Sequence, residues 1–279
     1  MSQDGGGRRT AGARVIALMN QKGGVGKTTT TVSVGAAMAL RGQRVLLIDL
    51  DPQSHLSLSL GIEPDRIEKT VYDLMTDEDC SALEVVQTVE GYTKLAVMPS
   101  ETNLAGLDAE LSELSAEGRS QTLLRDKCRD LFTHFDVVLI DCPPALGLLT
   151  VNGLAASSEV VIPMQAHFLA MQGMSELLQT VQSMRQHLND QLRVAGVVIC
   201  MYEGNTLLAS DVINEVREFF EQYRGSDAPW ADAIVFQPPI RRNIRLAEAP
   251  GHGRSVHTYA PDSNGAADYQ ALADAILTY

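Results

Sequence analysis

Short apolar runs, separated by segments long enough for helices, constrain the fold of this chain more than any other feature. The runs are rich in valine and isoleucine and do not alternate apolar with polar residues, which is typical of parallel strands buried on both faces. Strands that alternate with helices are joined by right-handed crossovers. We therefore expect a doubly wound α/β fold, a mainly parallel sheet with helices on both faces. The expected strands span residues 14–19, 44–50, 94–99, 136–141, 159–164, 193–201 and 233–238.

The remaining segments predict the helices and the domain limits. A chain of 279 residues can bury a large core as one domain, and we expect a single domain over residues 14–279 after a flexible leader, residues 1–13. Residues 223–233 are expected to form a surface loop within it. The leader is polar and glycine-rich, without the apolar core of a signal peptide, so a cytoplasmic protein is expected. The expected helices span residues 28–41, 103–115, 119–132, 169–188, 206–222 and 266–278.

Charge and cysteine content narrow the classes of function. The formal net charge is −13, which argues against a protein coated in nucleic acid but leaves room for a local basic face. Four cysteines are scattered without a C-x-x-C pair, so reduced, buried thiols are favoured over a metal centre or disulfides. The six histidines show no metal-ligand spacing.

A glycine-rich loop follows the first expected strand, with the sequence NQKGGVGKTTT at Asn20–Thr30. The usual phosphate-loop pattern, G-x-x-x-x-G-K-[ST], places a glycine five residues before the second one. Counting back from Gly26, that position holds Gln21, and a Gly23–Gly24 pair comes later. A plain glycine turn before a helix is the alternative. The lysine, the threonines and the strand–loop–helix context favour a nucleotide site.

The residues from Gly23 to Thr29, Val25 included, are expected to surround the phosphates of a nucleotide. Glycines let the backbone approach a phosphate closely, and successive N–H groups at a helix N-terminus bind anions. Lys27 is expected to neutralise the β- and γ-phosphates, Thr28 to ligate Mg²⁺ and Thr29 to reach the α-phosphate.

Aspartates follow two further strands, at the edge of the sheet where ligands bind in such folds. Asp49 and Asp51 lie in the sequence DLDPQ on the same face of an extended segment, and Asp141 ends the apolar run DVVLID. A carboxylate beside the γ-phosphate can hold the metal's water ligands or orient the attacking water, and Asp141 is placed to hold Mg²⁺ through water. Three strand ends thus converge on one chemistry, that of a nucleoside triphosphatase.

Lys22 precedes the usual lysine, Lys27, by five residues, and its side chain could reach a nucleotide in a second subunit. Here the sequence resembles the ParA/MinD family of ATPases, whose deviant Walker A loop reads [KR]-G-G-x-x-G-K-[ST]. The segments DLDPQ, LIDCPP and RRNIRLAEAPGHG resemble its ParA/Soj branch, which partitions chromosomes and plasmids. The resemblance runs from about residue 14 to the C-terminus.

The resemblance implies roles for several residues. Lys22 matches the lysine that contacts the partner's nucleotide in an ATP-sandwich homodimer. Asp51 matches the aspartate that positions the hydrolytic water, and Asp141 matches the Walker B aspartate. The adenine pocket would involve Met201, Pro239 and Asn243, although IRRN replaces the usual IPRN. Larger members carry an N-terminal DNA-binding extension, for which the leader is too short.

The ParA/Soj resemblance also implies an output: non-specific DNA binding by the ATP dimer, and release when a ParB-like partner stimulates hydrolysis. Phosphate contacts suffice for such binding and make it steeply salt-dependent. For the clustered residues Arg241, Arg242 and Arg245, the competing role is support of the nucleotide pocket. For Arg217, the alternative is that it only solvates the face of a helix. The candidate DNA contacts are Arg217, Arg241, Arg242 and Arg245.

Other classes of protein that share the deviant loop fit this sequence less well. A MinD-like membrane ATPase would need a basic amphipathic C-terminal helix, whereas this chain ends AADYQALADAILTY, which we expect to pack on the sheet. Iron–sulfur carriers need placed cysteines, and Cys142 has no nearby mate. ParA-like positioning of a protein cargo, such as a chemoreceptor array or carboxysome, remains open, as does an ATP-switched scaffold that does not bind DNA.

Overall fold

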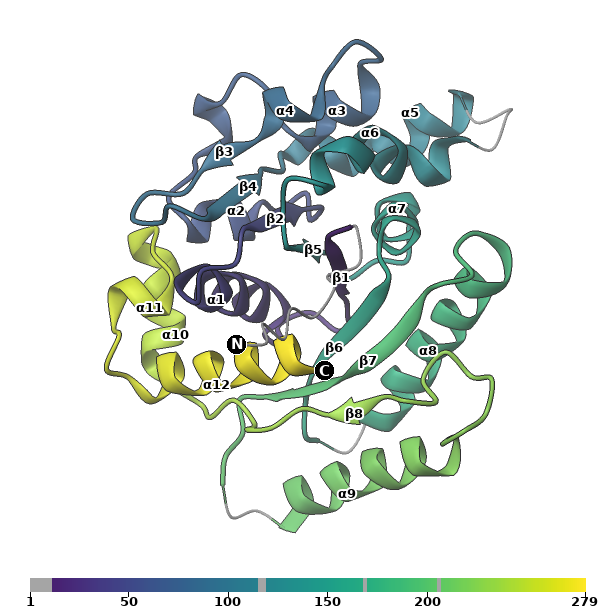
Figure 1. Cartoon of the computed structure of the whole chain (residues 1–279), viewed down its shortest axis with the longest axis vertical. Coiled ribbons are helices and arrows are strands. Elements are labelled where there is room, and N and C mark those ends of the chain that lie inside the picture. The colour runs from purple at the N-terminus through teal and green to yellow at the C-terminus, as the bar shows by residue number, and fades with distance from the viewer. Residues whose placement is uncertain (1–11, 115–118, 168–169, 205–206) are drawn as a thin grey trace, which may run out of the picture.

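The computed structural model describes residues 12–114, 119–167, 170–204 and 207–279. Within these ranges the strands form one sheet in the order β3-β4-β2-β5-β1-β6-β7-β8, which crosses the molecule in Figure 1. All pairings are parallel except that of the edge strand β3. The strands are β1 (Arg14–Leu18), β2 (Val45–Asp49), β3 (Gln87–Thr88), β4 (Leu95–Met98), β5 (Val137–Asp141), β6 (Glu159–Gln165), β7 (Arg193–Cys200) and β8 (Ile234–Val235).

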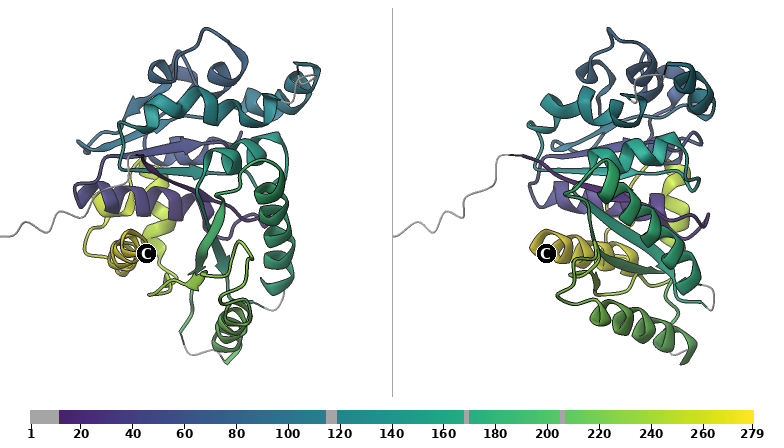
Figure 2. Two further views of the ribbon diagram at one scale, coloured as in Figure 1. Left: turned by 45° about the vertical axis from the view of Figure 1, so that its right-hand side comes forward. Right: turned by 90° about the vertical axis from the view of Figure 1, so that its right-hand side faces the viewer.

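Helices cover both faces of the sheet, which confirms the expected doubly wound fold (Figure 2). One apolar core lies under α1 (Lys27–Leu40), α2 (His55–Ser59) and α12 (Asn264–Thr278). Two short helices adjoin this layer, α10 (Ile244–Glu248) and α11 (Val256–Tyr259). The core on the other face lies under α3 (Val71–Thr76), α4 (Ala82–Val85), α5 (Leu107–Leu114), α6 (Leu123–Phe132), α7 (Leu148–Ala156), α8 (Ala170–His187) and α9 (Leu207–Gln222).

Close packing of α1 on the sheet positions the glycine-rich loop. Strands β2 and β5 are buried over their whole length, and α1 lies across them. A Cβ atom at Gly35 would come within 2.5 Å of a Leu47 methyl carbon, so glycine allows the helix to approach the strands. Tyr269 and Ile276 of α12 are buried beside α1, in the apolar core on this face of the sheet. The C-terminal helix, expected to pack on the sheet, thus packs mainly against α1 within the helical layer that covers it.

The expected elements differ from the observed ones mainly at their ends. The strand expected at 233–238 is wrong in length, because β8 is only two residues long and is followed by Pro238 and Pro239, which have no N–H to donate. The helices expected at 103–115 and 119–132 begin as the 3₁₀ turns η2 (Thr102–Gly106) and η4 (Arg119–Thr122). Residues 1–11, most of the expected leader, lie outside the described residues.

Several short elements were not expected from the sequence. Residues 55–90 contain α2, α3, α4 and β3, and α7 follows the loop after β5. Further short elements lie before α12: α10, the 3₁₀ turn η5 (Ala249–His252) and α11. These elements bring the segments after β2 and β8 together, because α2 contacts η5, and both segments border the candidate site.

Candidate nucleotide-binding site

The glycine-rich loop leaves the carboxyl end of β1 and opens α1, as the sequence predicts. Gly24 and Gly26 have φ angles of 72° and 93°, in the left-handed region that glycine adopts without a steric penalty. Val25, between them, is buried, so this residue anchors the loop with its side chain and offers a ligand only its backbone. The loop therefore presents backbone N–H groups next to the first turn of a 14-residue helix, an arrangement that binds phosphate.

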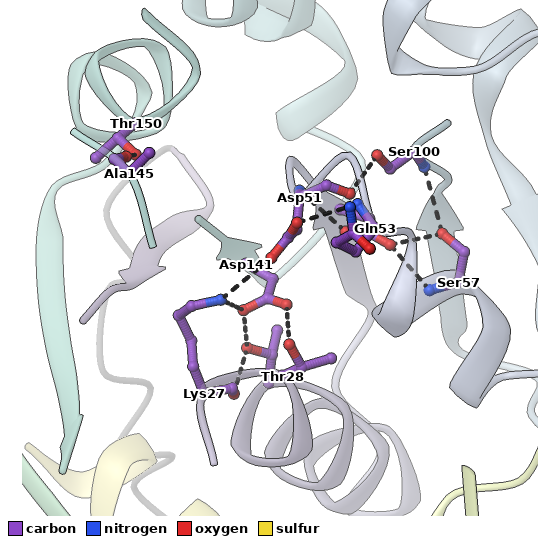
Figure 3. A network of polar contacts seen from close by, with 11 residues as sticks. Lys27, Thr28, Asp51, Gln53, Ser57, Ser100, Asp141, Ala145 and Thr150 are labelled. Atoms are coloured by element: carbon purple, nitrogen blue, oxygen red, sulfur yellow. Dashed lines mark hydrogen bonds and ion pairs between the residues drawn. The ribbon is translucent and has the colours of Figure 1, made fainter. Parts of the chain in front are cut away.

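Asp141, at the end of β5, is the centre of the polar network under the loop (Figure 3). Its carboxylate accepts a hydrogen bond from the Thr28 hydroxyl at 2.7 Å and from the Thr31 hydroxyl at 3.3 Å. The ammonium of Lys27 donates to the same carboxylate at 3.3 Å and lies 3.9 Å from Asp51. The structure thus brings together the residues that the sequence predicts for phosphate and metal chemistry.

These oxygens suit Mg²⁺. Magnesium prefers oxygen ligands and is usually held by one or two carboxylates together with substrate phosphates and water. The Thr28 hydroxyl and the Asp51 carboxylate line the space in front of the loop, and the buried Asp141 carboxylate lies beneath it, hydrogen-bonded to Thr28, so together they supply such a donor set. Thr28 and Asp141 would hold the ion, and its role when bound is to neutralise the charge of the β- and γ-phosphates.

Burial and mutual attraction set the charges of this network. Burial lowers the pKa of Lys27, but nearby Asp141 and Asp51 outweigh it, and the pKa is raised above its ordinary value. Burial raises the pKa of Asp141, and the neighbouring Lys27 only partly offsets it. The lysine is therefore a firmly charged cation, and its positive charge keeps a fully buried carboxylate ionisable at the base of the site.

Asp49 has a different role from Asp51. Its side chain is fully buried and accepts hydrogen bonds from the Ser57 hydroxyl at 2.8 Å, the Ser57 N–H at 3.0 Å and the Asp51 N–H at 3.2 Å. Ser100, beyond β4, donates its hydroxyl to the Asp51 carbonyl at 2.6 Å (Figure 3). Burial, with nearby Asp141, raises the pKa of Asp49 to about 7. Asp49 and Ser100 thus fix the loop that carries Asp51, while Asp51 itself faces the cavity.

Two adjoining cavities lie along the carboxyl edge of the sheet. The first, about 560 Å³, lies in front of the glycine-rich loop and is lined by Lys22, Lys27, Thr28 and Asp51, among others. The second, about 440 Å³, is lined mainly by the segment 240–247 and is more apolar. The two share Gly26, Thr29 and Met201. A charged cavity continuous with an apolar one matches the triphosphate and the base of a nucleotide.

Two of the three residues predicted to contact the base lie at the apolar cavity. Met201 and Asn243 line the apolar cavity, and Pro239 is not among its lining residues. The Asn243 side chain also accepts the Arg245 N–H at the start of α10. Sequence reasoning missed Tyr269, which lines the cavity from α12. A lone tyrosine in an amphipathic helix carries no signal of such a role, because the fold alone brings α12 to this edge.

The segment 241–245 lies beside the same cavity. Each of its arginines pairs with an acid of the same subunit: Arg241 with Asp268 at 2.6 Å, Arg242 with Glu203 at 2.6 Å and Arg245 with Glu248 at 2.7 Å. Arg241 holds a nearly buried carboxylate through several hydrogen bonds. Arg217, on α9, is exposed and forms no ion pair with any residue that the structure describes. The four candidate DNA contacts therefore differ in whether an acid of the same subunit already pairs with their guanidinium group.

The four cysteines are free and buried, as expected, and burial raises the pKa of the Cys142 thiol to about 12. Along the described ranges, no helix is both long and apolar enough to cross a membrane.

Taken together, the parallel sheet, the loop that opens α1, Lys27, Thr28 and the buried Asp141 define a P-loop nucleoside triphosphatase with an additional lysine at the mouth of its loop.

Comparison with known proteins narrows this class. A family model described as an AAA domain matches residues 13–194. The sporulation initiation inhibitor protein Soj of Bacillus subtilis is 42% identical over 263 residues, which cover 93% of this chain and 96% of the relative. The chromosome-partitioning ATPase Soj of Thermus thermophilus is 41% identical, with 96% of each chain covered. The chain belongs to the Soj/ParA family of chromosome-partitioning ATPases, as the resemblance of its motifs implied.

A solved structure supports the assignment of the ligands. A Mycobacterium smegmatis protein described as cobyrinic acid a,c-diamide synthase, with a bound ATP analogue and magnesium, is 35% identical, has a TM-score of 0.78 and matches 95% of this chain and 94% of its own. The fold, the motifs and the family together make this protein an ATPase whose cofactors are ATP and Mg²⁺.

Proposed function

We propose that this ATPase forms an ATP-sandwich homodimer that binds DNA without sequence preference and releases it when a ParB-like partner stimulates hydrolysis. In this cycle it segregates chromosome or plasmid DNA, as a cytoplasmic protein associated with the nucleoid in its ATP state. The proposal starts from membership of the Soj/ParA family. The observation that carries it within this chain is the position of Lys22.

Lys22 is exposed at the mouth of the phosphate cavity. Lys27 already provides the cation inside the cavity, where its ammonium lies 3.3 Å from Asp141. The Lys22 ammonium instead contacts His167, on the loop after β6, at 2.6 Å. A second cation at the rim, outside the subunit's own phosphate site, is suited to a phosphate that approaches from another subunit.

The face around this rim supports a dimer interface. Large apolar side chains are exposed on segments that follow the carboxyl ends of several strands, and Leu58, Met201 and Ile244 among them line the two cavities of the site, where exposed apolar surface would suit an interface. Leu207 is 84% exposed and Ile244 is 69% exposed. The exposed apolar residues on these segments are Leu58, Leu146, Met201, Leu207, Leu208 and Ile244.

Hydrolysis would use the residues assembled in front of the loop. Lys27 and the backbone N–H groups would hold the triphosphate, and Thr28 and Asp141 would hold the metal, whose charge would neutralise it. Asp51 would position the attacking water, since its carboxylate faces the cavity while its backbone is fixed by Asp49 and Ser100. We expect slow basal turnover, with the timing set by the partner protein.

DNA contact would come from Arg217 first, because it is exposed and no acid among the residues that the structure describes pairs with it. Arg242 and Arg245 would have to exchange Glu203 and Glu248 for DNA phosphates, whereas Arg241 holds Asp268 more extensively. Exposed pairs are weak, with a typical value of about 0–1 kcal/mol, so this exchange is feasible for Arg242 and Arg245.

Sedimentation of the protein with a non-hydrolysable ATP analogue and Mg²⁺ tests the dimer. The wild-type protein should dimerise with the analogue and stay monomeric with ADP. Lys22→Ala should bind the analogue as a monomer but not dimerise. A Lys22→Ala variant that dimerises like the wild type, or a wild-type protein that stays monomeric, would contradict the proposal.

DNA binding by arginine variants tests the output. Arg217→Ala should weaken binding of the ATP-state dimer to duplex DNA by a similar factor for different sequences and should leave the dimer intact. Arg129→Ala is the matched control, because Arg129 is also exposed but lies on α6, at the opposite end of the molecule from α9 in Figure 1. Equal effects of the two substitutions would remove Arg217 from the DNA surface.

A further inference from the structure

The turn that carries Lys22 is held from one side by β6 and the residues that follow it. Asn20, at the start of the turn, donates its side-chain amide to the Pro163 carbonyl at 2.7 Å and accepts the Lys22 N–H at 2.9 Å. The Gln165 amide donates to the Gly24 carbonyl at 3.1 Å. The backbone on both sides of Lys22 is therefore tethered to the β6 side, and this tether directs the lysine side chain toward the loop after β6.

The Lys22 side chain ends on His167. Its ammonium nitrogen lies 2.6 Å from Nε2 of the imidazole. An ammonium group can only donate hydrogen bonds, so Nε2 has to accept, and the ring has to be neutral with its proton on Nδ1. His167 is partly buried beside α8, and this contact holds the cation on its own subunit.

We propose that His167 is a positioning residue for Lys22, which it holds in the free subunit and must release before the lysine can contact the nucleotide of a partner subunit. This inference rests on the proposed ATP-sandwich dimer. It assigns to His167 a regulatory role: the hydrogen bond to Lys22 competes with dimer closure and sets how readily the ATP-bound subunit pairs.

Two substitutions at His167 test whether its acceptor atom holds Lys22. His167→Ala removes the acceptor, so the lysine is free in the single subunit. His167→Gln keeps a side-chain oxygen that can accept from the ammonium. One hydrogen bond of this kind is worth a factor of about two to ten, and a symmetric dimer releases two. The dimer dissociation constant should thus be at least about fourfold lower in His167→Ala than in the wild type.

Sedimentation equilibrium with a non-hydrolysable ATP analogue and Mg²⁺ measures these constants. The dissociation constant of the His167→Gln dimer should stay close to that of the wild type, because the glutamine oxygen replaces the acceptor. The control is His187→Ala, because that imidazole contacts only the Ser183 carbonyl of its own helix among the described residues and its removal should leave the wild-type constant unchanged.

The outcomes distinguish this inference from the proposed function. A wild-type protein that forms no dimer with the analogue would refute the proposed function and this inference with it. A dimer whose dissociation constant is the same in the wild type and in His167→Ala would refute the inference alone. A weaker dimer in His167→Ala would show that His167 supports closure and would also overturn it.

Discussion

The buried lysine of the loop should matter for stability as well as for ATP binding, and Lys27→Ala tests both. Lys27 is 8% exposed and lies between Asp141, at 3.3 Å, and Asp51, at 3.9 Å. Its removal leaves the fully buried Asp141 with only hydroxyl donors. We expect the variant to lose ATP binding, and to lose stability by an amount that depends on pH.

The size of the loss in unfolding free energy depends on whether Asp141 stays charged in the folded variant or takes up a proton. Breaking a buried ion pair costs about 3–5 kcal/mol, which is the loss expected at pH 8. Asp141 can instead take up a proton, at a cost of about 1.4 kcal/mol for each pH unit above its unfolded-state pKa. With the ordinary value of 3.8, this second route costs at most about 6 kcal/mol at pH 8 and at most about 1.6 kcal/mol at pH 5, because the wild-type protein, in which the pKa of Asp141 is already raised, bears part of the same cost. The substitution raises the folded-state pKa of Asp141, so the stability lost should grow as the pH rises.

Denaturant unfolding of the nucleotide-free protein at pH 5 and pH 8 measures the two losses. Lys22→Ala is the matched control, because it removes an exposed lysine from the same loop and should change the free energy of unfolding by less than about 0.5 kcal/mol. A Lys27→Ala loss that is equal at both pH values, or no larger than that of Lys22→Ala, would refute the reasoning.

Three further predictions follow from the packing of the site and the sheet. Burial raises the pKa of Asp49 to about 7, so its protonated form stabilises the fold at low pH. The unfolding free energy of the wild type minus that of Asp49→Asn should therefore fall by up to about 4 kcal/mol between pH 4 and 7 and then level off. Unfolding curves in which this difference does not change with pH would contradict the prediction. Gly196→Ala should cost about 2–4 kcal/mol in thermal unfolding, because its Cβ would lie 2.2 Å from the Ile234 carbonyl oxygen, while Gly173→Ala, which meets nothing within 4 Å, should be neutral or stabilising. Asp51→Ala should slow ATP turnover and prolong the ATP dimer, and normal dissociation of that dimer would remove Asp51 from the water-positioning role.

The sequence predicts the central part of the fold and the phosphate side of the site well. Buried parallel strands leave continuous apolar runs, and the phosphate loop and Asp141 lie directly at strand ends, where sequence position and spatial position coincide. The regions missed are those in which short elements pack through long-range contacts. Residues 55–90 did contain a local signal, since Thr70 with Asp73 and Ser81 with Glu84 form capping boxes at the starts of α3 and α4.

The base side of the site could be predicted only in part, because it is built from distant segments. Tyr269 reaches the apolar cavity from α12 and hydrogen-bonds Thr30 at 3.0 Å, and no local pattern links the two residues. The pairing of Arg241 with Asp268 likewise joins residues far apart in the chain. A cluster of arginines in the sequence therefore says little about which of them are free to bind DNA.

The most direct test of the central claim, that bound ATP switches DNA binding through the dimer, is binding to random-sequence duplex DNA across a salt series. Wild-type protein with an ATP analogue and Mg²⁺ should bind tightly and lose affinity steeply as salt rises. The same protein with ADP, and Lys22→Ala with the analogue, should bind weakly at every salt concentration. Equal binding in all three cases, or none by a wild-type protein that has dimerised, would contradict the account.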